Sequence, residues 1–576
     1  MMEYAWIEAD PACPKKIANL VKEVKISPLV AQLLVKRGIE NYAQAEAFFR
    51  PKWEHVNDPF LFTNMREAVR LLQEAIKEKK RILLFGDYDV DGTSAVAICY
   101  NVLSKHTKNI DYYIPDRYAE GYGISELGIN HAIASKVDLF ISLDCGIRSI
   151  QWIDLLRTNG IEVIVCDHHE PGEHLPNACI LDPKVSGETY PFEGLSGAGV
   201  AMKLLEAFYV TIDGDRNHLL AQMDLLALSI AADIVPVVDE NRVYAFMGLK
   251  EMNHKIRPSF RQMLTRAKRN GQILLSDLVF ALAPRINAAG RIRTGRTAVA
   301  CMLDVPPEAV DVLVEAIEQD NAQRRALDAS ITQQALERLE NEAKDRSSNI
   351  LYSEDWHKGV VGIVASRVIE SFPFPTIILT EKDGVLSGSA RTVGNFDLHQ
   401  ALVKLDSYLI QYGGHQHAAG LTLKKERFEA FKIAFNALAK SYFDTHDKKP
   451  TIQMDAKLSL SELFGNESPH GIPKLVRLLE SFEPFGPGNM KPIFLTEEAY
   501  AIESKVLKDL HLKIKAIQPP FHASIEGIGF NLASKELLTS NGVAFDLAYT
   551  LEINEFNGRR KIQANIKAIR ENSLTL

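Results

Sequence analysis

Acids and imidazoles follow four apolar runs in this 576-residue chain, each at the point where the run ends. Carboxylates combined with one or two imidazoles suit Mn²⁺ or Mg²⁺ better than a metal that prefers thiolates. Four such segments in one place would repel one another unless cations lay among them. The residues concerned are Asp87, Asp89 and Asp91; Asp144; Asp167, His168 and His169; and Asp233.

The spacing of these residues indicates two ions rather than one. Asp89 and Asp91 are two residues apart near a turn, so each can face a different ion, and Asp144 can bridge the pair. Two ions about 3.5–4 Å apart are the usual arrangement for hydrolysing phosphodiesters or phosphoanhydrides. A single Asp after a strand is most often a helix cap or turn residue. Only the four segments together, with His168 beside His169, therefore indicate a metal centre.

Short apolar strands alternate with helices between residues 76 and 265, and they must position these side chains. Such alternation predicts an α/β domain with a parallel sheet covered on both faces. Ligands of these sheets bind at the carboxyl ends of the strands, where three of the four segments fall. We expect the helix after the first acidic segment to start at Thr93 and Ser94. Residues 1–75 form an N-terminal helical segment by the same periodicity.

The rest of the chain divides into three regions. Residues 266–345 form a connecting region whose long helix would span about 54 Å if straight. Residues 346–447 form a second, smaller α/β domain with the glycine-rich segment "YGGHQHAAG". Residues 448–576 alternate like exposed-face strands, which predicts a small all-β barrel with the OB-fold. Asn557 and Gly558 are a strong two-residue hairpin signal within it.

The bulk composition excludes several classes of protein. The chain is 46% hydrophobic and 24% charged, which is typical of globular domains. Its net charge of −8 lacks the basic footprint of many nucleic-acid binders, although a local basic groove can exist within an acidic average. The six cysteines include no C-x-x-C pair, so Cys145 and Cys166 are expected to be buried hydrophobic residues. The start lacks a signal-peptide core and no apolar run is long enough for a membrane; we expect a cytoplasmic protein.

The order of the acidic motifs resembles that of a known superfamily. "DYDVDG", "DCG", "DHH" and "ADIVP" are similar to the four motifs of the DHH phosphoesterases. "IPDRYAEGYG", "PRINAAGR", "GVVGIVASR", "GSART" and "GGHQHAAG" narrow the resemblance to its single-strand-specific 5′→3′ DNA exonucleases, which have DHH and DHHA1 domains and an OB-fold. The resemblance covers about residues 50–576. It implies release of 5′-mononucleotides from single-stranded DNA in recombination and repair.

The resemblance also implies roles for the acidic segments. His169 would contact the scissile phosphate, with Asp144 and His168 as the other catalytic residues. Many members of the superfamily have a histidine at the position of Phe85, which cannot bind metal, so more weight falls on Asp87. Asp167 is expected to orient His168 rather than to bind metal. The implied ligands of two Mn²⁺ or Mg²⁺ ions are Asp87, Asp89, Asp91, Asp144, His168 and Asp233.

Phosphate-binding residues are implied by the other motifs. Arg117, Ser389 and Arg391 resemble a pocket for a 5′-terminal phosphate. The helix opened by "GVVG" and the residues Gly414 and His415 would contact phosphate through N–H groups, and His417 would be structural. Arg285, Asn287 and Arg291 would clamp the backbone of single-stranded DNA. In isolation their motif is typical of a solvated basic loop.

Three alternatives and several partners accompany this hypothesis. A DHH-type phosphodiesterase for short oligonucleotides or cyclic dinucleotides would lack the long helix and the barrel. A non-catalytic single-strand DNA-binding scaffold would lack metal ligands, and a manganese pyrophosphatase would lack the arginine-rich motifs. The basic tail after residue 558 fits either DNA tracking or a protected edge strand. The implied partners are single-stranded DNA with a 5′ end, a single-strand-binding protein and a RecQ-type helicase, and we expect a monomer.

Overall fold

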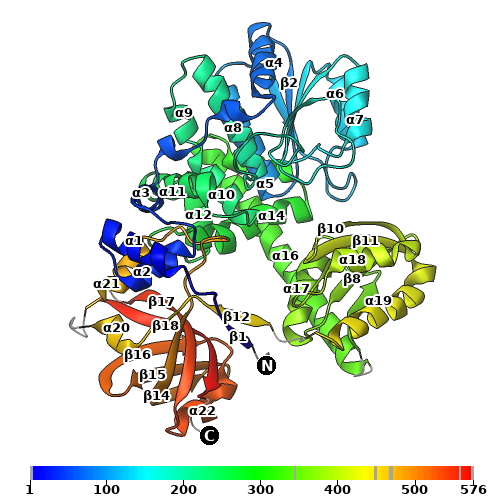
Figure 1. Ribbon diagram of the computed structural model, residues 1–576. Coiled ribbons are helices and arrows are strands. Elements are labelled where there is room, and N and C mark those ends of the chain that lie inside the picture. The colour runs from blue at the N-terminus through cyan, green and yellow to red at the C-terminus, as the bar shows by residue number, and fades with distance from the viewer. Residues whose placement is uncertain (1–3, 343–345, 447–449, 466–470, 557–558, 573–576) are drawn as a thin grey trace.

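The computed structural model describes residues 4–342, 346–446, 450–465, 471–556 and 559–572. Its strands form a five-stranded parallel sheet, a five-stranded mixed sheet, a six-stranded sheet that closes on itself, and a two-stranded sheet. Figure 1 shows the first two sheets in separate domains linked by the long helix α16 (Pro307–Asn341), with the closed sheet below them. The predicted fold class, two α/β domains joined by a long helix and followed by an all-β barrel, is confirmed.

The first domain contains the parallel sheet, in the order β3-β2-β4-β5-β6. Its central strands are buried along their whole length because helices cover both faces. This burial explains why the strands are almost continuously apolar in sequence. The strands are β2 (Ile82–Gly86), β3 (Ile110–Tyr113), β4 (Leu139–Leu143), β5 (Glu162–Cys166) and β6 (Cys179–Leu181).

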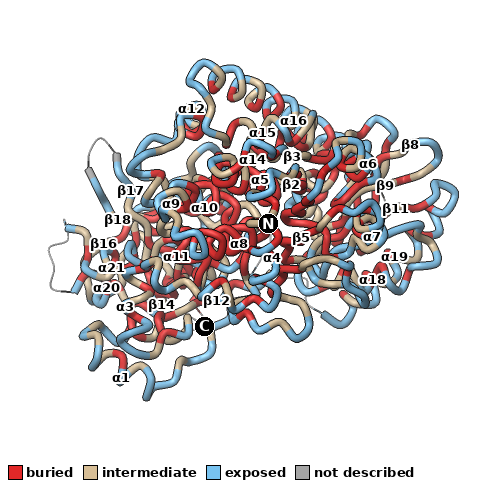
Figure 2. Tube along the Cα trace, turned by 90° about the horizontal axis from the view of Figure 1, so that it is seen from above, coloured by how far each residue is buried: buried red, intermediate tan, exposed pale blue. Residues whose placement is uncertain are grey.

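Successive residues of each strand contribute to different cores. Leu84 packs with α4, α5 and α8 in the largest cluster, whereas Leu83 and Phe85 pack with α6 and α7 on the opposite face. Figure 2 shows buried segments concentrated around α5, α8 and α10. The helices are α4 (Met65–Lys77), α5 (Val90–Leu103), α6 (Glu126–Ala134), α7 (Ile150–Thr158), α8 (Gly197–Thr211), α9 (Asn217–Leu220) and α10 (Met223–Ala232).

A helical layer connects this domain to α16. Its helices share the largest hydrophobic cluster with the parallel sheet, as does the first half of α16 up to Ile317. No helix of the described residues is both long and apolar enough to cross a membrane. The elements of the layer are α11 (Asp239–His254), α12 (Pro258–Arg266), α13 (Leu275–Asp277), the π-helix η3 (Leu278–Leu282), α14 (Ala283–Ile292) and α15 (Gly295–Met302).

The second domain packs against the other half of α16, where Ile331 and Leu339 contact α17. One long helix therefore contributes to both domain cores. The domain's sheet runs in the order β10-β11-β9-β8-β7, and only β7 and β8 are parallel. Its elements are β7 (Asn349–Ser353), α17 (Val361–Ser371), β8 (Thr376–Lys382), β9 (Val385–Arg391), α18 (Leu398–Lys404), β10 (Leu409–Gly414), β11 (Ala418–Lys424) and α19 (Phe428–Phe443).

The C-terminal sheet is a barrel because β14 pairs with both β15 and β17. The predicted Asn557–Gly558 turn lies outside the described residues, but the strands on either side of it pair antiparallel. The elements are β12 (Thr451–Met454), β13 (Ala456–Lys457), α20 (Leu460–Phe464), α21 (Lys474–Glu480), β14 (Phe494–Leu507), β15 (His511–Gln518), β16 (Phe521–Gly529), α22 (Glu536–Ser540), β17 (Phe545–Phe556) and β18 (Arg559–Glu571).

The N-terminal helices pack with this barrel although they lie at the other end of the sequence. Leu20, Leu33 and Phe48 belong to the same hydrophobic cluster as barrel residues such as Phe482 and Phe494. Strand β1 (Ala5–Glu8) also pairs in parallel with β12. Figure 1 shows these segments beside the barrel. The helices are α1 (Pro14–Val24), α2 (Pro28–Val35) and α3 (Tyr42–Phe49).

Candidate metal centre and active site

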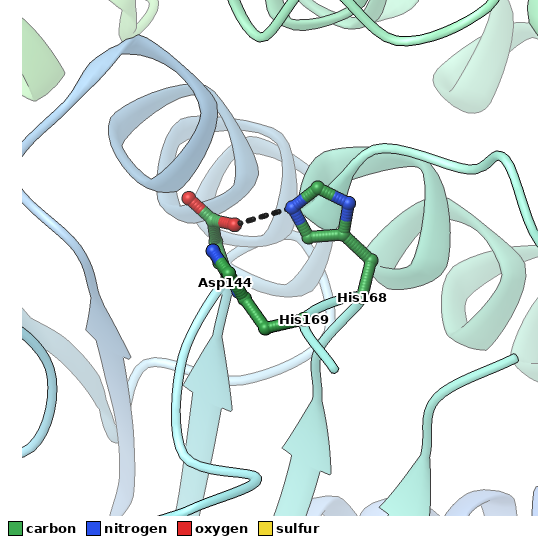
Figure 3. A group of neighbouring side chains, drawn as sticks. All are labelled: Asp144, His168 and His169. Carbon is green, nitrogen blue, oxygen red and sulfur yellow. Dashed lines mark ion pairs between the residues drawn. The ribbon is translucent and has the colours of Figure 1, made fainter. Parts of the chain in front are cut away.

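The carboxyl ends of three neighbouring strands bring the predicted acids together. β2, β4 and β5 are adjacent and parallel, and they end just before Asp87, Asp144 and Asp167 respectively. Helix α10 brings the fourth segment, because Asp233 is its C-cap. Figure 3 shows the Asp144 carboxylate and the His168 ring facing each other above these strand ends.

His168 is held so that one ring nitrogen faces only acceptors. Its Nδ1 lies 3.0 Å from the carbonyl oxygen of Leu195. Because a carbonyl can only accept, Nδ1 carries the proton, and burial lowers the pKa of the ring. Nε2 then presents a lone pair to carboxylate oxygens of Asp144 at 3.2 Å, Asp233 at 3.6 Å and Asp91 at 3.7 Å.

Several buried atoms of this cluster have no hydrogen-bond partner: Asp87 Oδ1, Asp144 Oδ1 and His168 Nε2. Leaving such atoms unmatched is costly, so they indicate a missing counter-charge. Burial, followed by the nearby carboxylates, raises the pKa of Asp87 and Asp144 well above the usual range and that of Asp233 to about 8. The C-terminal end of α10 adds a further unfavourable field at Asp233.

The ligand atoms fall into overlapping groups that fit divalent cations. One group is Asp87, Asp89 and Asp144, and a second is Asp91, His168 and Asp233, with ligand atoms within 4.8 Å of one another. Asp144 also joins His168 and His169 in a third group. Carboxylate oxygens with imidazole are the donor set of Mn²⁺ or Mg²⁺. The unmatched acceptors and the donor chemistry therefore both fit a two-cation centre.

Two of the acids have additional structural partners. Asp89 caps α5, because its Oδ1 accepts from the N–H groups of Asp91 and Gly92. The helix consequently begins at Val90, and the prediction of a start at Thr93 was wrong. Asp89 was the stronger cap because its carboxylate reaches two free N–H groups at once.

Asp91 is anchored at the start of α8. Its carboxylate accepts from the N–H groups of Gly197 and Ala198 at 2.7 and 2.9 Å and from the Ser229 hydroxyl at 2.7 Å. A helix N-terminus favours a negative charge. A Cβ at Gly197 would lie 2.6 Å from Asp144 Oδ1, so only glycine allows α8 to approach this closely. The sequence signal for this anchor, "LSGAG" before an apolar helix, was missed.

His169 forms a separate hydrogen-bonded chain. Its Nδ1 is 2.7 Å from Asp167 Oδ1, and its Nε2 is 3.0 Å from the hydroxyl of Tyr122. Burial lowers the pKa of His169, but the bond to Asp167 outweighs it and raises the pKa to about 9. Asp167 thus orients His169, whereas the Leu195 carbonyl orients His168. The prediction that Asp167 orients His168 was wrong, and sequence analysis also missed Tyr122.

Phe85 lies outside the centre. It is fully buried and stacks with Tyr113 and Phe140, each at 5.5 Å between ring centroids. The side chain occupies the core beneath α6 and α7. The first acidic group is therefore made of carboxylates alone among the predicted residues.

Arg117, Ser389 and Arg391, the residues predicted to bind a terminal phosphate, lie where the two α/β domains meet. Arg391 donates to the Ser389 hydroxyl at 2.8 Å on β9. A Cβ at Gly362, in the first turn of α17, would lie 3.1 Å from both Arg391 Nη2 and Ser389 Oγ. Burial, followed by nearby Arg117 from the first domain, lowers the pKa of Arg391. In the part of the chain that the structure describes, neither arginine forms an ion pair with a carboxylate.

The remaining predicted contacts differ in their availability. Arg291 donates to the Gly359 carbonyl, which ties α14 to the second domain, and Asn287 is half-buried on the same helix. His415 is exposed after Gly414 at the β10–β11 hairpin, and partial burial of its ring, followed by nearby His417 and Arg391, lowers its pKa. Arg285 is engaged elsewhere, because its Nε donates to Glu318 of α16 at 2.7 Å.

Comparison with known proteins identifies the class of this centre. The chain matches the DHH family, N-terminal domain, over residues 81–230, and the DHHA1 domain over residues 347–441. It also matches the RecJ OB domain over residues 454–568. The fold and the site are therefore those of a metal-dependent phosphoesterase of the DHH superfamily.

Full-length relatives identify the branch. The chain is 32% identical to the single-stranded-DNA-specific exonuclease RecJ of Bacillus subtilis, covering 96% of this chain and 69% of the relative. Identity to the Escherichia coli exonuclease of the same name is also 32%, over 95% of this chain and 96% of the relative. This chain belongs to the RecJ exonuclease family.

Solved structures agree with this assignment. RecJ of Thermus thermophilus in complex with Mn²⁺ has a TM-score of 0.84 at 25% identity, covering 99% of this chain and 80% of that one. Another exonuclease RecJ bound to manganese has a TM-score of 0.58 at 31% identity, covering 66% of this chain and 95% of that one. Both similar structures hold the metal that the acidic cluster fits.

Proposed function

We propose that this protein is a 5′→3′ exonuclease that degrades single-stranded DNA to 5′-mononucleotides. The observation that carries the proposal is that two neighbouring groups of opposite charge, one acidic and one basic, each lack a counter-charge. Carboxylates without a counter-charge surround His168 Nε2. Arg117 of the first domain and Arg391 of the second face each other nearby, and neither forms an ion pair with a carboxylate among the described residues. A phosphodiester chain with divalent cations complements both. The relatives are named single-stranded-DNA-specific exonucleases, which supports single-stranded DNA as the substrate.

The two acidic groups would hold the cations. Asp87, Asp89 and Asp144 would hold one, and Asp91, His168 and Asp233 the other. Asp144, whose carboxylate also lies 3.2 Å from His168 Nε2, would bridge the two. Bound divalent cations supply Lewis acidity that activates water and neutralises charge on the phosphate. The hydrogen bonds of Asp89 and Asp91 to the N-termini of α5 and α8 fix the directions of their remaining lone pairs. The ligands would thus be preorganised by backbone elements rather than by flexible loops.

His169 would contact the scissile phosphate. Asp167 fixes the ring through Nδ1, so that Nε2 points towards the hydroxyl of Tyr122. Its side chain is 43% exposed, whereas that of His168 is 10% exposed, so His169 is the imidazole that substrate can reach. We therefore propose that His168 binds metal and that His169 contacts the phosphate.

Polarity would come from the pocket at the domain junction. Arg117, Ser389 and Arg391, with the N-terminal turn of α17, would bind a 5′-terminal phosphate by charge-assisted hydrogen bonds. Gly414 and His415 would line the same side, and Asn287 and Arg291 would contact the following backbone. Arg285 would act from further away, since its ion pair with Glu318 anchors α14 to α16.

The barrel would extend the binding path for the single strand. Some basic residues of its last strand are already paired, since Arg560 contacts Glu480 and Arg570 contacts Asp546. Backbone tracking would therefore depend on the others together with exposed aromatic residues. We further propose that the protein acts as a cytoplasmic monomer, and that a single-strand-binding protein and a RecQ-type helicase deliver its substrate.

The direct test uses two single-stranded oligonucleotides, one labelled at the 5′ end and one at the 3′ end, with Mn²⁺. The 5′ label should appear at once as mononucleotide, and the 3′ label should pass through a ladder of shortening products. Asp144→Ala should abolish both patterns. Release of the 3′ label first would contradict the polarity, and full activity of Asp144→Ala would contradict the centre. DNA binding without cleavage would favour the scaffold alternative.

A second test addresses the terminal-phosphate pocket. Arg391→Ala should lower kcat/KM for a 5′-phosphorylated strand by about 10-fold, because a charge-assisted contact is lost. The same variant should cleave a 5′-hydroxyl strand almost as well as the parent protein does. Lys404→Ala, an exposed residue on α18 of the same domain, is the matched control. An unchanged preference for the phosphorylated end would remove Arg391 from the pocket.

A further inference from the structure

Ile234 has a backbone conformation that its side chain disfavours. It follows the C-cap of α10, Asp233, and has a φ of 60°. The left-handed conformation is common at this position after a helix, but its usual occupants are glycine or asparagine. A β-branched residue there is a genuine outlier, because its branched Cβ crowds the backbone. The conformation therefore needs an explanation beyond ordinary helix termination.

Comparable positions elsewhere in the chain carry a different kind of residue. Lys79, Lys136 and Lys268 each follow a helix C-cap with a φ between 53° and 58°. Within the described ranges, all other non-glycine residues with positive φ are Lys, Asp, Glu or Asn, so Ile234 is the single apolar member of the set. The need to end a helix therefore does not explain why isoleucine stands at position 234.

The side chain of Ile234 adds little to the fold, because 67% of it is exposed. An exposed apolar side chain is unremarkable by itself. Here the residue directly follows Asp233, whose carboxylate is 3.6 Å from His168 Nε2. Adjacent Cα atoms are about 3.8 Å apart, so Ile234 stands at the rim of the metal centre.

Contacts on both sides of Ile234 hold the strained conformation. On one side, Asp233 belongs to the acidic cluster and its N–H donates to Ser229. On the other, the N–H of Val237 donates to the Pro487 carbonyl of the barrel region at 2.7 Å. Strain of this kind persists only when the surroundings fix it, and it concentrates at functional sites.

We propose that Ile234 is a substrate-contacting residue that packs against the face of a nucleobase beside the metal centre. The inference rests on the proposed function. Segment 233–237 runs from the metal centre to the contact with the barrel region. A DNA strand that extended from the metal centre to the barrel would therefore pass over this segment. Every base has an apolar face, so an aliphatic contact tolerates any sequence. A base that covered this side chain would remove its apolar surface from water, which is favourable for binding.

The test compares Ile234→Asn, Ile234→Val and the matched control Lys136→Asn on 5′-phosphorylated single strands with Mn²⁺. Asparagine accepts a positive φ, so both Asn variants should keep or raise Tm. Ile234→Asn should raise KM roughly 5-fold with little change in kcat. Ile234→Val, which keeps a smaller aliphatic side chain, should raise KM by less than Ile234→Asn does, and Lys136→Asn should match the parent protein.

Oligonucleotides with a single abasic site at successive positions then identify the contact. The parent protein should lose affinity at one position, and Ile234→Asn should show no further loss there. An unchanged KM, a Tm that falls together with activity, or an equal abasic penalty in both proteins would overturn the inference. If the parent protein degrades no single strand, the proposed function fails and the inference fails with it.

Discussion

Two clusters of buried carboxylates differ in whether their polar side-chain atoms have partners within the described chain. Between α8 and α11, Lys203 is fully buried and forms ion pairs with Glu206 and Glu240. The Tyr244 and Tyr190 hydroxyls each donate to one of these carboxylates at 2.6 Å. At the sheet edge, buried carboxylate oxygens and the His168 Nε2 lone pair face one another without a partner.

The difference teaches that burial of acids does not by itself mark an active site. The Lys203 cluster is complete within the chain and holds the segment around Asn57, whose carbonyl accepts from Lys203 at 2.9 Å. The Asp144 cluster is complete only when cations are supplied from solution. Unmatched acceptors, rather than acidic residues, distinguish function from structure here.

Removing the cation of the matched cluster should have the larger effect on stability. Lys203→Met leaves Glu206 and Glu240 buried without a counter-charge, which typically costs about 3–5 kcal/mol. Denaturant unfolding monitored by circular dichroism measures the loss. Lys250→Met, an exposed lysine on the neighbouring α11, should change the unfolding free energy by less than about 0.5 kcal/mol. A loss below about 1 kcal/mol for Lys203→Met would contradict the claim that Lys203 is the essential counter-charge of Glu206 and Glu240.

Removing a carboxylate from the unmatched cluster should have a smaller effect of opposite sign. Asp144→Asn deletes one of the mutually repelling charges, and asparagine accepts the φ of 61° at this position. In EDTA, the unfolding free energy should rise by roughly 1 kcal/mol. Thermal unfolding of both proteins in EDTA measures the change. A variant less stable than its parent under these conditions would mean that Asp144 is already compensated within the chain.

The sequence predicted the residues of the centre better than their partners. Asp87, Asp144 and His168 were predictable because parallel strands end at one edge and each acid follows a strand. The orientation of His168 was not, because its partner is a backbone carbonyl at Leu195, and backbone carbonyls carry no sequence signal. The prediction therefore gave Asp167 the wrong histidine.

Long-range packing limited the prediction of the fold in the same way. Periodicity located α2 and the barrel strands, but it gave no sign that residues around Leu33 and Phe48 share a core with Phe482 and Phe494. Arg242 illustrates the cause. Its guanidinium donates to the carbonyls of Phe48, Phe482, Pro484 and Glu483 and so joins three distant segments through backbone atoms alone.

The central claim, that the unmatched cluster is a cation site, is tested most directly by titrating the metal-free protein with Mn²⁺. Calorimetry and thermal unfolding should both detect binding, with a stabilisation of about 2.7 kcal/mol when Mn²⁺ reaches one hundred times its Kd. Asp144→Asn should lose most of this stabilisation, and Lys250→Met should keep it. Equal Mn²⁺ binding by the parent protein and Asp144→Asn, or no binding by either, would contradict the account.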